Sequence, residues 1–212
     1  MSTLLKIDVS TRGPLSISRK LSSRFVEQWR QVHTNCKVIE RDIATTELPF
    51  LQLPWIVANF NKASARTDEQ RVLLKFSDDL VAELQRADEY LIATPMYNFG
   101  IPAKLKAYID HTVRSGLTFR MNADGSYEGL LRNKKATVII ASAGEYKPGA
   151  PAEGLDTLKP YLREILGFIG VTDVTFIQSG STWKVDNGSE KADEHIAALK
   201  DQVMAAASAQ VA

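Results

Sequence analysis

Cysteine and histidine are scarce in this sequence. Cys36 is the only cysteine among 212 residues, which excludes a disulfide framework and a thiolate zinc cluster within one chain. The three histidines, His33, His111 and His195, lie far apart and have no metal-ligand spacing. We therefore expect no bound metal and a reducing compartment, the cytoplasm.

Charge of one sign and long apolar runs are also missing. Lys plus Arg number 26 and Asp plus Glu 25, so no strong field attracts a phosphate backbone or an anionic lipid surface. No apolar run approaches the roughly 20 residues of a membrane-spanning helix. The N-terminal segment already carries Lys6 and Asp8, unlike a signal peptide. We expect neither nucleic acid nor a membrane as a partner.

The chain does contain β-branched runs that alternate with amphipathic stretches, as in a parallel sheet covered on both faces. The predicted strands are Leu4–Val9, Lys37–Asp42, Tyr90–Thr94, Ala136–Ala141 and Asp173–Gln178. Five helices are predicted. The first spans about Ser16–His33, the second starts near Thr67 and turns Leu73, Phe76, Leu80 and Leu84 inward, and the third starts at Pro102. The fourth carries Leu155, Leu158, Leu162, Ile165 and Ile169, and the fifth spans about Ser189–Ala207. This pattern predicts one α/β domain over residues 1–212 with a doubly wound, five-stranded parallel sheet. Periodicity alone leaves the flavodoxin-like order 2-1-3-4-5 and a Rossmann half open.

Two segments interrupt the alternation. Residues 45–66 form a long connection whose apolar part, residues 48–60, either packs on its own domain or docks on a partner chain. Residues 117–134 predict a small hairpin around Asn122–Gly125.

The loop after the first predicted strand, Ser10–Ser18, contains hydroxyl side chains and leads directly into a helix. Hydroxyls and the N–H groups of a helix N-terminus can converge on one phosphate. The loop lacks G-x-G-x-x-G and the P-loop lysine, which favours a phosphomonoester over a dinucleotide or a nucleoside triphosphate. The alternative is that Ser16 only caps the helix and Arg12 lies in solvent.

The loop after the third strand, Thr94–Pro102, places an apolar side chain, two aromatic rings and an amide where a strand turns into a helix. Such a ledge suits a planar aromatic ligand, although it could also be an ordinary buried turn. The loop after the fourth strand, Ala141–Tyr146, begins with small residues and could approach the edge of the same ligand.

Several blocks together resemble the bacterial FMN-dependent NADH:azoreductase and NAD(P)H quinone reductase family. They are Ser10 with Ser16 and Ser18, Pro95–Phe99, Arg114–Arg120, Pro160–Leu162 and Leu166–Gly170. The resemblance implies a flavodoxin-like cytoplasmic homodimer, with one FMN per subunit and active sites at the dimer interface.

The resemblance also implies the site residues. FMN is expected on Ser10, Ser16, Ile17, Ser18, Met96, Tyr97, Asn98, Phe99, Ser142, Ala143, Gly144 and Glu145, and the substrate on Phe60, Phe99, Phe119 and Phe168. Many relatives have Ser-x-Gly-Gly in this loop, where this chain has Ser142-Ala-Gly-Glu145. A carboxylate near the flavin pyrimidine would disfavour an anionic reduced flavin.

The resemblance implies a ping-pong reaction with NADH or NADPH as the electron donor. A quinone would be reduced in one round of this reaction, and an aromatic azo compound would be cleaved to amines in two rounds. Hydride transfer at flavin N5 requires no catalytic side chain. The alternatives are a flavodoxin-type electron carrier that acts on partner proteins and, with less support because the glycine fingerprint is absent, an NAD-binding dehydrogenase.

Overall fold

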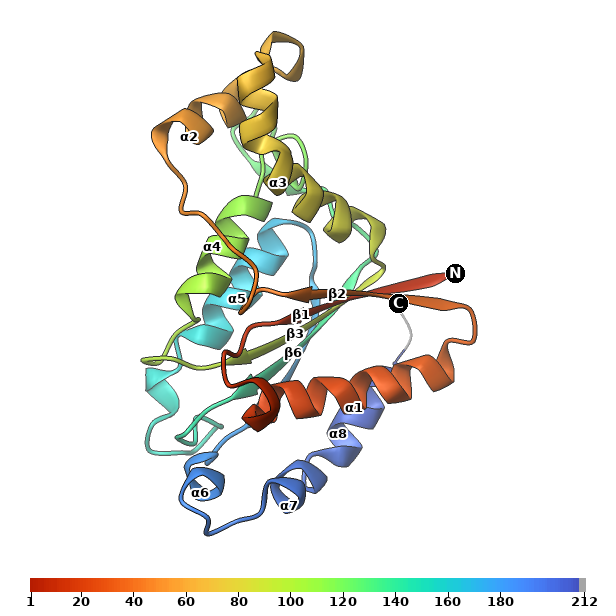
Figure 1. The fold of residues 1–212 in the computed structure, drawn as a ribbon, viewed down its shortest axis with the longest axis vertical. Helices are drawn as coiled ribbons and strands as arrows, with labels where there is room; N and C mark the ends of the chain where they lie inside the picture. The colour runs from red at the N-terminus through yellow and green to blue at the C-terminus, as the bar shows by residue number, and fades with distance from the viewer. Residues whose placement is uncertain (210–212) are drawn as a thin grey trace.

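Five parallel strands form the central sheet of the computed structural model, which describes residues 1–209 (Figure 1). The remaining residues of the predicted domain, 210–212, lie outside the described part. The sheet order is β2-β1-β3-β6-β7. The strands are β1 Ser2–Asp8, β2 Cys36–Asp42, β3 Glu89–Pro95, β6 Lys135–Ala141 and β7 Asp173–Ser179. Counted over these five strands, the order is 2-1-3-4-5, which confirms the flavodoxin-like prediction.

Helices cover both faces of the sheet, as Figure 1 shows. On one face lie α1 (Ile17–Val32), α7 (Ala192–Ala197) and α8 (Lys200–Ser208), and on the other lie α3 (Asp68–Arg86), α4 (Ala103–Thr112) and α5 (Leu158–Phe168). Successive strand residues point to opposite faces. Leu4 accordingly belongs to the core under α1, whereas Leu5 belongs to the core under α3, α4 and α5.

The capping signals in the sequence set two helix starts. Ser16 is the N-cap of α1, and its side chain accepts the backbone N–H of Arg19 at 3.3 Å. Thr67 and Gln70 form the complete capping box at the start of α3. Both predictions are confirmed, because each cap satisfies an N–H group that has no partner within its own helix.

Three helix predictions were wrong in detail. In α3 the core residue is Leu74, fully buried, whereas Leu73 is exposed, so the inward face begins one residue later than expected. Leu155 lies in a separate 3-10 turn, Glu153–Leu155, because Asp156 Oδ1 accepts the N–H groups of Leu158 and Lys159 and starts α5 there. The last helix, predicted over about Ser189–Ala207, is divided: a turn separates α7 from α8, and both helices contact α1. A further short helix, α6 (Trp183–Asp186), precedes this region.

The connection over residues 45–66 contains a helix, α2 (Leu53–Phe60), that the sequence analysis did not predict. Trp55 and Ala58 pack against Leu74 of α3, so one face of this apolar segment docks on its own chain. In Figure 1, α2 and the first turns of α3 stand out from the rest of the molecule. The predicted hairpin is confirmed, with β4 (Phe119–Met121) antiparallel to β5 (Tyr127–Gly129).

A buried arginine attaches α2 to the molecule. The Arg114 side chain is fully buried and follows the end of α4. Its Nε donates to Asn59 Oδ1 at 2.5 Å, and its Nη1 lies 3.1 Å from Asp78 Oδ1 and also donates to Ser77. The guanidinium lies 5.2 Å from the ring centroid of Trp55, within the range of a cation–π contact. Arg114 therefore joins α2, α3 and α4.

Within residues 1–209, none of the helices combines the length and the apolar character needed to cross a membrane.

Candidate active site

A cleft of about 240 Å³ opens at the carboxyl ends of β1, β3 and β6. The connections of β1 and β3 leave in opposite directions along the sheet, which is where ligands bind in open α/β sheets. Seven of the predicted cofactor residues line this cleft: Ser10, Ser16, Ile17, Ser18, Met96, Tyr97 and Ala143. The remaining lining residues are Arg12, Pro95, Ala141, Thr182 and Asp186.

One wall of the cleft is a loop of buried hydroxyl side chains that runs into α1. Ser10, Ser16 and Ser18 are at most 3% exposed, and the Oγ atoms of Ser16 and Ser18 lie 3.1 Å apart. The first N–H groups of α1 have no partner inside the helix, and the helix dipole adds positive potential at this end. The donor set of this wall fits a phosphomonoester.

Arg12 crosses from this loop to α6 rather than extending into solvent. Its Nη2 lies 2.6 Å from Asp186 Oδ1 and its Nη1 lies 3.1 Å from Oδ2, with both side chains about half exposed. The hydrogen bonds that Arg12 donates to Asp186 raise the pKa of Arg12. Asp186 and its neighbour Thr182 were missed, because the sequence analysis considered the loops after three strands only. The fifth strand ends at the same edge, and that was the available signal.

A second wall is the turn after β3. Tyr97 and Gly100 exchange two backbone hydrogen bonds of 3.0 Å, and the central residues Asn98 and Phe99 have φ values of 47° and 68°. Two successive positive φ values define a type I′ turn. A bulky residue rarely adopts this conformation, and strained backbone of this kind is concentrated at functional sites. The Phe99 carbonyl is held by Thr157, whose N–H and Oγ1 donate to it at 3.0 and 2.8 Å.

The loop after β6 contributes only Ala143 to the cleft. The Ser142 hydroxyl donates to the carbonyl of Gly144 at 2.9 Å, so it is engaged within the loop. The Glu145 carboxylate lies over Gly180, where an added Cβ would come within 2.1 Å of Glu145 Oε1, and 3.4 Å from Lys147 Nζ. The Glu145 side chain, which distinguishes this loop from Ser-x-Gly-Gly, therefore contacts the loop after β7 and Lys147.

The phenylalanines predicted for the substrate do not lie together within one chain. Phe119 and Phe168 pack with their ring centroids 4.7 Å apart, at the C-terminal end of α5. The Phe99 carbonyl accepts from Thr157, the N-cap of α5, whereas Phe168 ends this helix. The 11-residue helix is roughly 15 Å long, and this length separates Phe99 from the Phe119–Phe168 pair. Phe60, 75% exposed, lies on α2.

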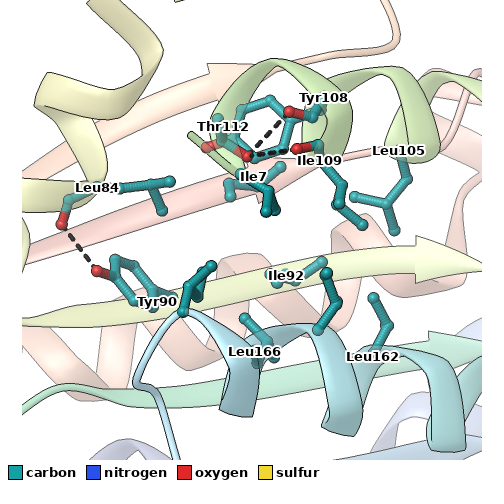
Figure 2. Close-up of a pocket in the computed structure, with 13 residues that line it drawn as sticks. Ile7, Leu84, Tyr90, Ile92, Leu105, Tyr108, Ile109, Thr112, Leu162 and Leu166 are labelled. Atoms are coloured by element: carbon teal, nitrogen blue, oxygen red, sulfur yellow. Dashed lines mark hydrogen bonds between the residues drawn. The ribbon is translucent and has the colours of Figure 1, made fainter. Parts of the chain in front are cut away.

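A second cavity, shown in Figure 2, lies inside the core and does not meet the cleft. It measures about 30 Å³, enough for a water molecule and far too small for an aromatic ring. Its walls are aliphatic side chains together with Tyr90, Tyr108 and Thr112. Burial raises the pKa of both tyrosines, so they stay neutral. This cavity is a packing defect between the sheet, α4 and α5.

His111, one of the scarce histidines, is packed inside the α2–α4 region. It is 2% exposed, its Nε2 lies 2.8 Å from the Pro49 carbonyl, and its ring meets the edges of Trp55 and Phe76. Among residues 1–209, no group of three or more His, Cys, Asp or Glu has the arrangement of a metal site.

Comparisons with known proteins place this cleft in a family. The family described by its flavodoxin-like fold matches residues 2–205. FMN-dependent NADH:quinone oxidoreductase 2 of a Jannaschia species is 44% identical over 98% of this chain and 100% of its own length. FMN-dependent NADH:quinone oxidoreductase of a Nostoc species is 42% identical over 96% of this chain and 97% of its own.

A solved structure gives the same fold. The azoreductase of Bacillus anthracis superimposes with a TM-score of 0.85 at 26% identity, covering 98% of this chain and 99% of its own. The position of the cleft, the strand order and these relatives all point to the same family. The chain is an oxidoreductase that belongs to the flavodoxin-like family and, within it, to the FMN-dependent NADH:quinone oxidoreductases.

Proposed function

We propose that this protein reduces quinones by two electrons at the expense of NADH, with FMN held in the cleft at the ends of β1, β3 and β6, and that it also cleaves aromatic azo compounds. The buried serine loop at the N-terminus of α1 carries the proposal, because its donors suit the one phosphate of FMN. FMN, when bound, would supply the hydride and two-electron chemistry that links the nicotinamide to the acceptor.

In this proposal, the residues of the chain bind and orient the FMN. Ser10, Ser16, Ile17 and Ser18 would hold the phosphate, and Met96 and Tyr97 would contact the ring, with Asn98 and Phe99 beside them on the same turn. The loop Ser142–Glu145 would border the polar edge of the ring through Ala143. Donor and acceptor would use the same open face in turn, in a ping-pong scheme.

The functional unit in this proposal is a homodimer with an active site at each side of the interface. The segment before α2, α2 itself and the beginning of α3 expose a group of large apolar side chains: Phe50, Leu53, Val57, Phe60 and Val72, each between 47% and 76% exposed. A surface of this kind marks an interaction site, and a second copy is the commonest partner. Phe60, Phe119 and Phe168 would then serve the partner's substrate pocket, which explains why they lie far from Phe99.

Introducing a charge on this surface is expected to separate the subunits. In Leu53→Glu, the carboxylate would be desolvated in the interface, so sedimentation should show a monomer at concentrations where the wild type is a dimer. Met204→Glu, on α8 at the opposite face of the sheet, is the control and should remain dimeric. A Leu53→Glu protein with unchanged mass would exclude this face from the interface.

The reaction itself is tested by anaerobic titration of the FMN-loaded protein. NADH should bleach the visible absorbance of the flavin rapidly, and a quinone added afterwards should restore it; the same titration with NADPH establishes the donor preference. If FMN binds and neither nucleotide bleaches it, the reductase proposal fails and a flavodoxin-type electron carrier replaces it. An azo dye as the second reagent tests the cleavage reaction separately.

Reducing nucleotides are supplied in the cytoplasm, and the single cysteine, Cys36, is free, so we place the enzyme there.

A further inference from the structure

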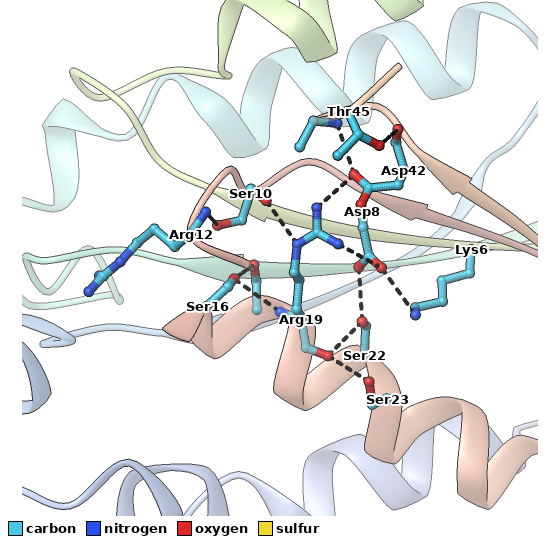
Figure 3. A network of polar contacts seen from close by, with 12 residues as sticks. Lys6, Asp8, Ser10, Arg12, Ser16, Arg19, Ser22, Ser23, Asp42 and Thr45 are labelled. Carbon is cyan, nitrogen blue, oxygen red and sulfur yellow. Dashed lines mark hydrogen bonds and ion pairs between the residues drawn. The ribbon is translucent and has the colours of Figure 1, made fainter. Parts of the chain in front are cut away.

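Beside the serine loop lies a network of the charged side chains Lys6, Asp8, Arg19 and Asp42, none of which lines the cleft (Figure 3). Arg19, in the first turn of α1, is at its centre. Its Nε donates to the backbone carbonyl of Ser10 at 2.8 Å, its Nη2 to Asp42 Oδ1 at 2.6 Å, and its Nη1 lies 3.5 Å from Asp8 Oδ2. Each carboxylate comes from the end of a different strand, β1 or β2.

The two carboxylates are fixed from other directions as well. Lys6 Nζ lies 3.0 Å from Asp8 Oδ2, and the Ser22 hydroxyl donates to Asp8 Oδ1 at 3.1 Å. Asp42 Oδ1 also accepts the N–H of Ala44 at 3.0 Å. Two cations therefore face two anions, so the network adds little net field to the cleft. Its effect must lie in the geometry that it imposes.

Arg19 contacts both ends of the serine loop. The side chain binds the Ser10 carbonyl, and the backbone N–H of the same residue donates to Ser16 Oγ at 3.3 Å. A carbonyl oxygen that faced the cleft would repel a phosphate, because the oxygen carries a partial negative charge and the phosphate a full one. Because the Ser10 carbonyl accepts from Arg19, which does not line the cleft, this oxygen is engaged outside the cleft.

We propose that Arg19 is the positioning residue of the phosphate site: it preorganises the Ser10–Ser16 loop and thereby sets the affinity for the phosphate of FMN, without contributing to the binding of the ring. This inference rests on the proposed function. Preorganisation of this kind raises affinity because the loop is not ordered at the expense of binding.

The test compares two ligands that differ only in the phosphate. Binding of FMN and of riboflavin is measured by quenching of flavin fluorescence for the wild type, Arg19→Gln and Arg19→Lys. Arg19→Gln should weaken FMN about 10- to 100-fold, the range for loss of charge-assisted hydrogen bonds, and leave riboflavin unchanged. Arg19→Lys keeps the charge but cannot bind the Ser10 carbonyl and both carboxylates at once, so it should recover FMN binding only in part.

Asp42→Ala separates orientation from charge. If Arg19 acted through its field alone, removal of the nearby anion would tighten FMN binding. If it acts by orientation, loss of the Asp42 contact leaves the guanidinium less constrained, so FMN binding should weaken. Arg24→Gln, an exposed arginine on the same helix, is the matched control and should bind FMN like the wild type.

The outcomes distinguish this inference from the proposed function. A wild-type protein without FMN affinity would contradict the proposed function itself. A wild type that binds FMN would overturn the role of Arg19 if Arg19→Gln weakened FMN and riboflavin equally or neither, if Arg19→Lys restored FMN binding completely, or if Asp42→Ala bound FMN more tightly. Circular dichroism melting of each variant verifies that the fold is retained.

Discussion

Ser16→Asp is expected to lower FMN affinity at least about 100-fold while the protein stays as stable as the wild type. Aspartate caps a helix as well as serine does, so α1 keeps its N-cap. The new carboxylate, however, would lie directly beside the phosphate that this loop is proposed to hold. At an effective dielectric constant of about 20, two like unit charges about 4 Å apart repel by about 4 kcal/mol, so even a fraction of this energy suffices.

Two companion measurements make the Ser16→Asp result specific. Riboflavin, which lacks the phosphate, should bind the variant nearly as well as the wild type. Ser16→Ala removes the cap without adding charge, so it should lower the free energy of unfolding by about 1 kcal/mol and weaken FMN far less than aspartate does. Strong FMN binding by Ser16→Asp would place the phosphate elsewhere in the cleft.

Arg114→Met is expected to lower the free energy of unfolding by about 3 kcal/mol, measured by urea denaturation. Methionine fills much of the volume of the aliphatic stem, but Asn59, Ser77 and Asp78 lose their shared donor. The figure is at the lower end of the usual range because Asp78 is half exposed and can be solvated again. Burial lowers the pKa of Arg114, whereas its pairing with Asp78 favours the charged form, and arginine stays protonated in proteins.

The matched control is Arg71→Met on α3. Arg71 pairs with Asp68 at 2.6 Å, but both side chains are more than half exposed, and such pairs contribute little. The expected change is within about 0.5 kcal/mol. Equal losses in the two variants would mean that Arg114 does not fasten α2, and that the helix is attached by its other contacts, such as the packing of Trp55 and Ala58 on Leu74.

The sequence predicted the sheet, and it singled out the two loops that line the cleft, because these depend on local signals. β3 and β6 are almost entirely buried, so their β-branched runs are continuous and unambiguous. Ser16 and Thr67 cap helices through contacts three residues away, which any reading along the chain can find. The loops followed, since parallel strands end at the same edge of the sheet.

What the sequence did not predict depends on long-range contacts. Asp186 meets Arg12 across 174 residues, and no local pattern indicates that pair. Arg19 reads as one more polar residue on an amphipathic helix until Ser10 and Asp42 are brought beside it. The prediction of the inward face of α3 was wrong for a similar reason. Leu73 and Leu74 are equally apolar, and only the position of α2 determines which one is buried.

The Phe99 carbonyl, held by two donors from Thr157, has a consequence for protein engineering. The two residues are 58 positions apart, yet the turn after β3 and the start of α5 are one mechanical unit. Grafting Met96–Ile101 from a relative to change acceptor preference would carry only half of this unit. A functional chimera must bring residue 157 and its donors along with the graft, or the turn will lose the support that keeps Phe99 in its left-handed conformation.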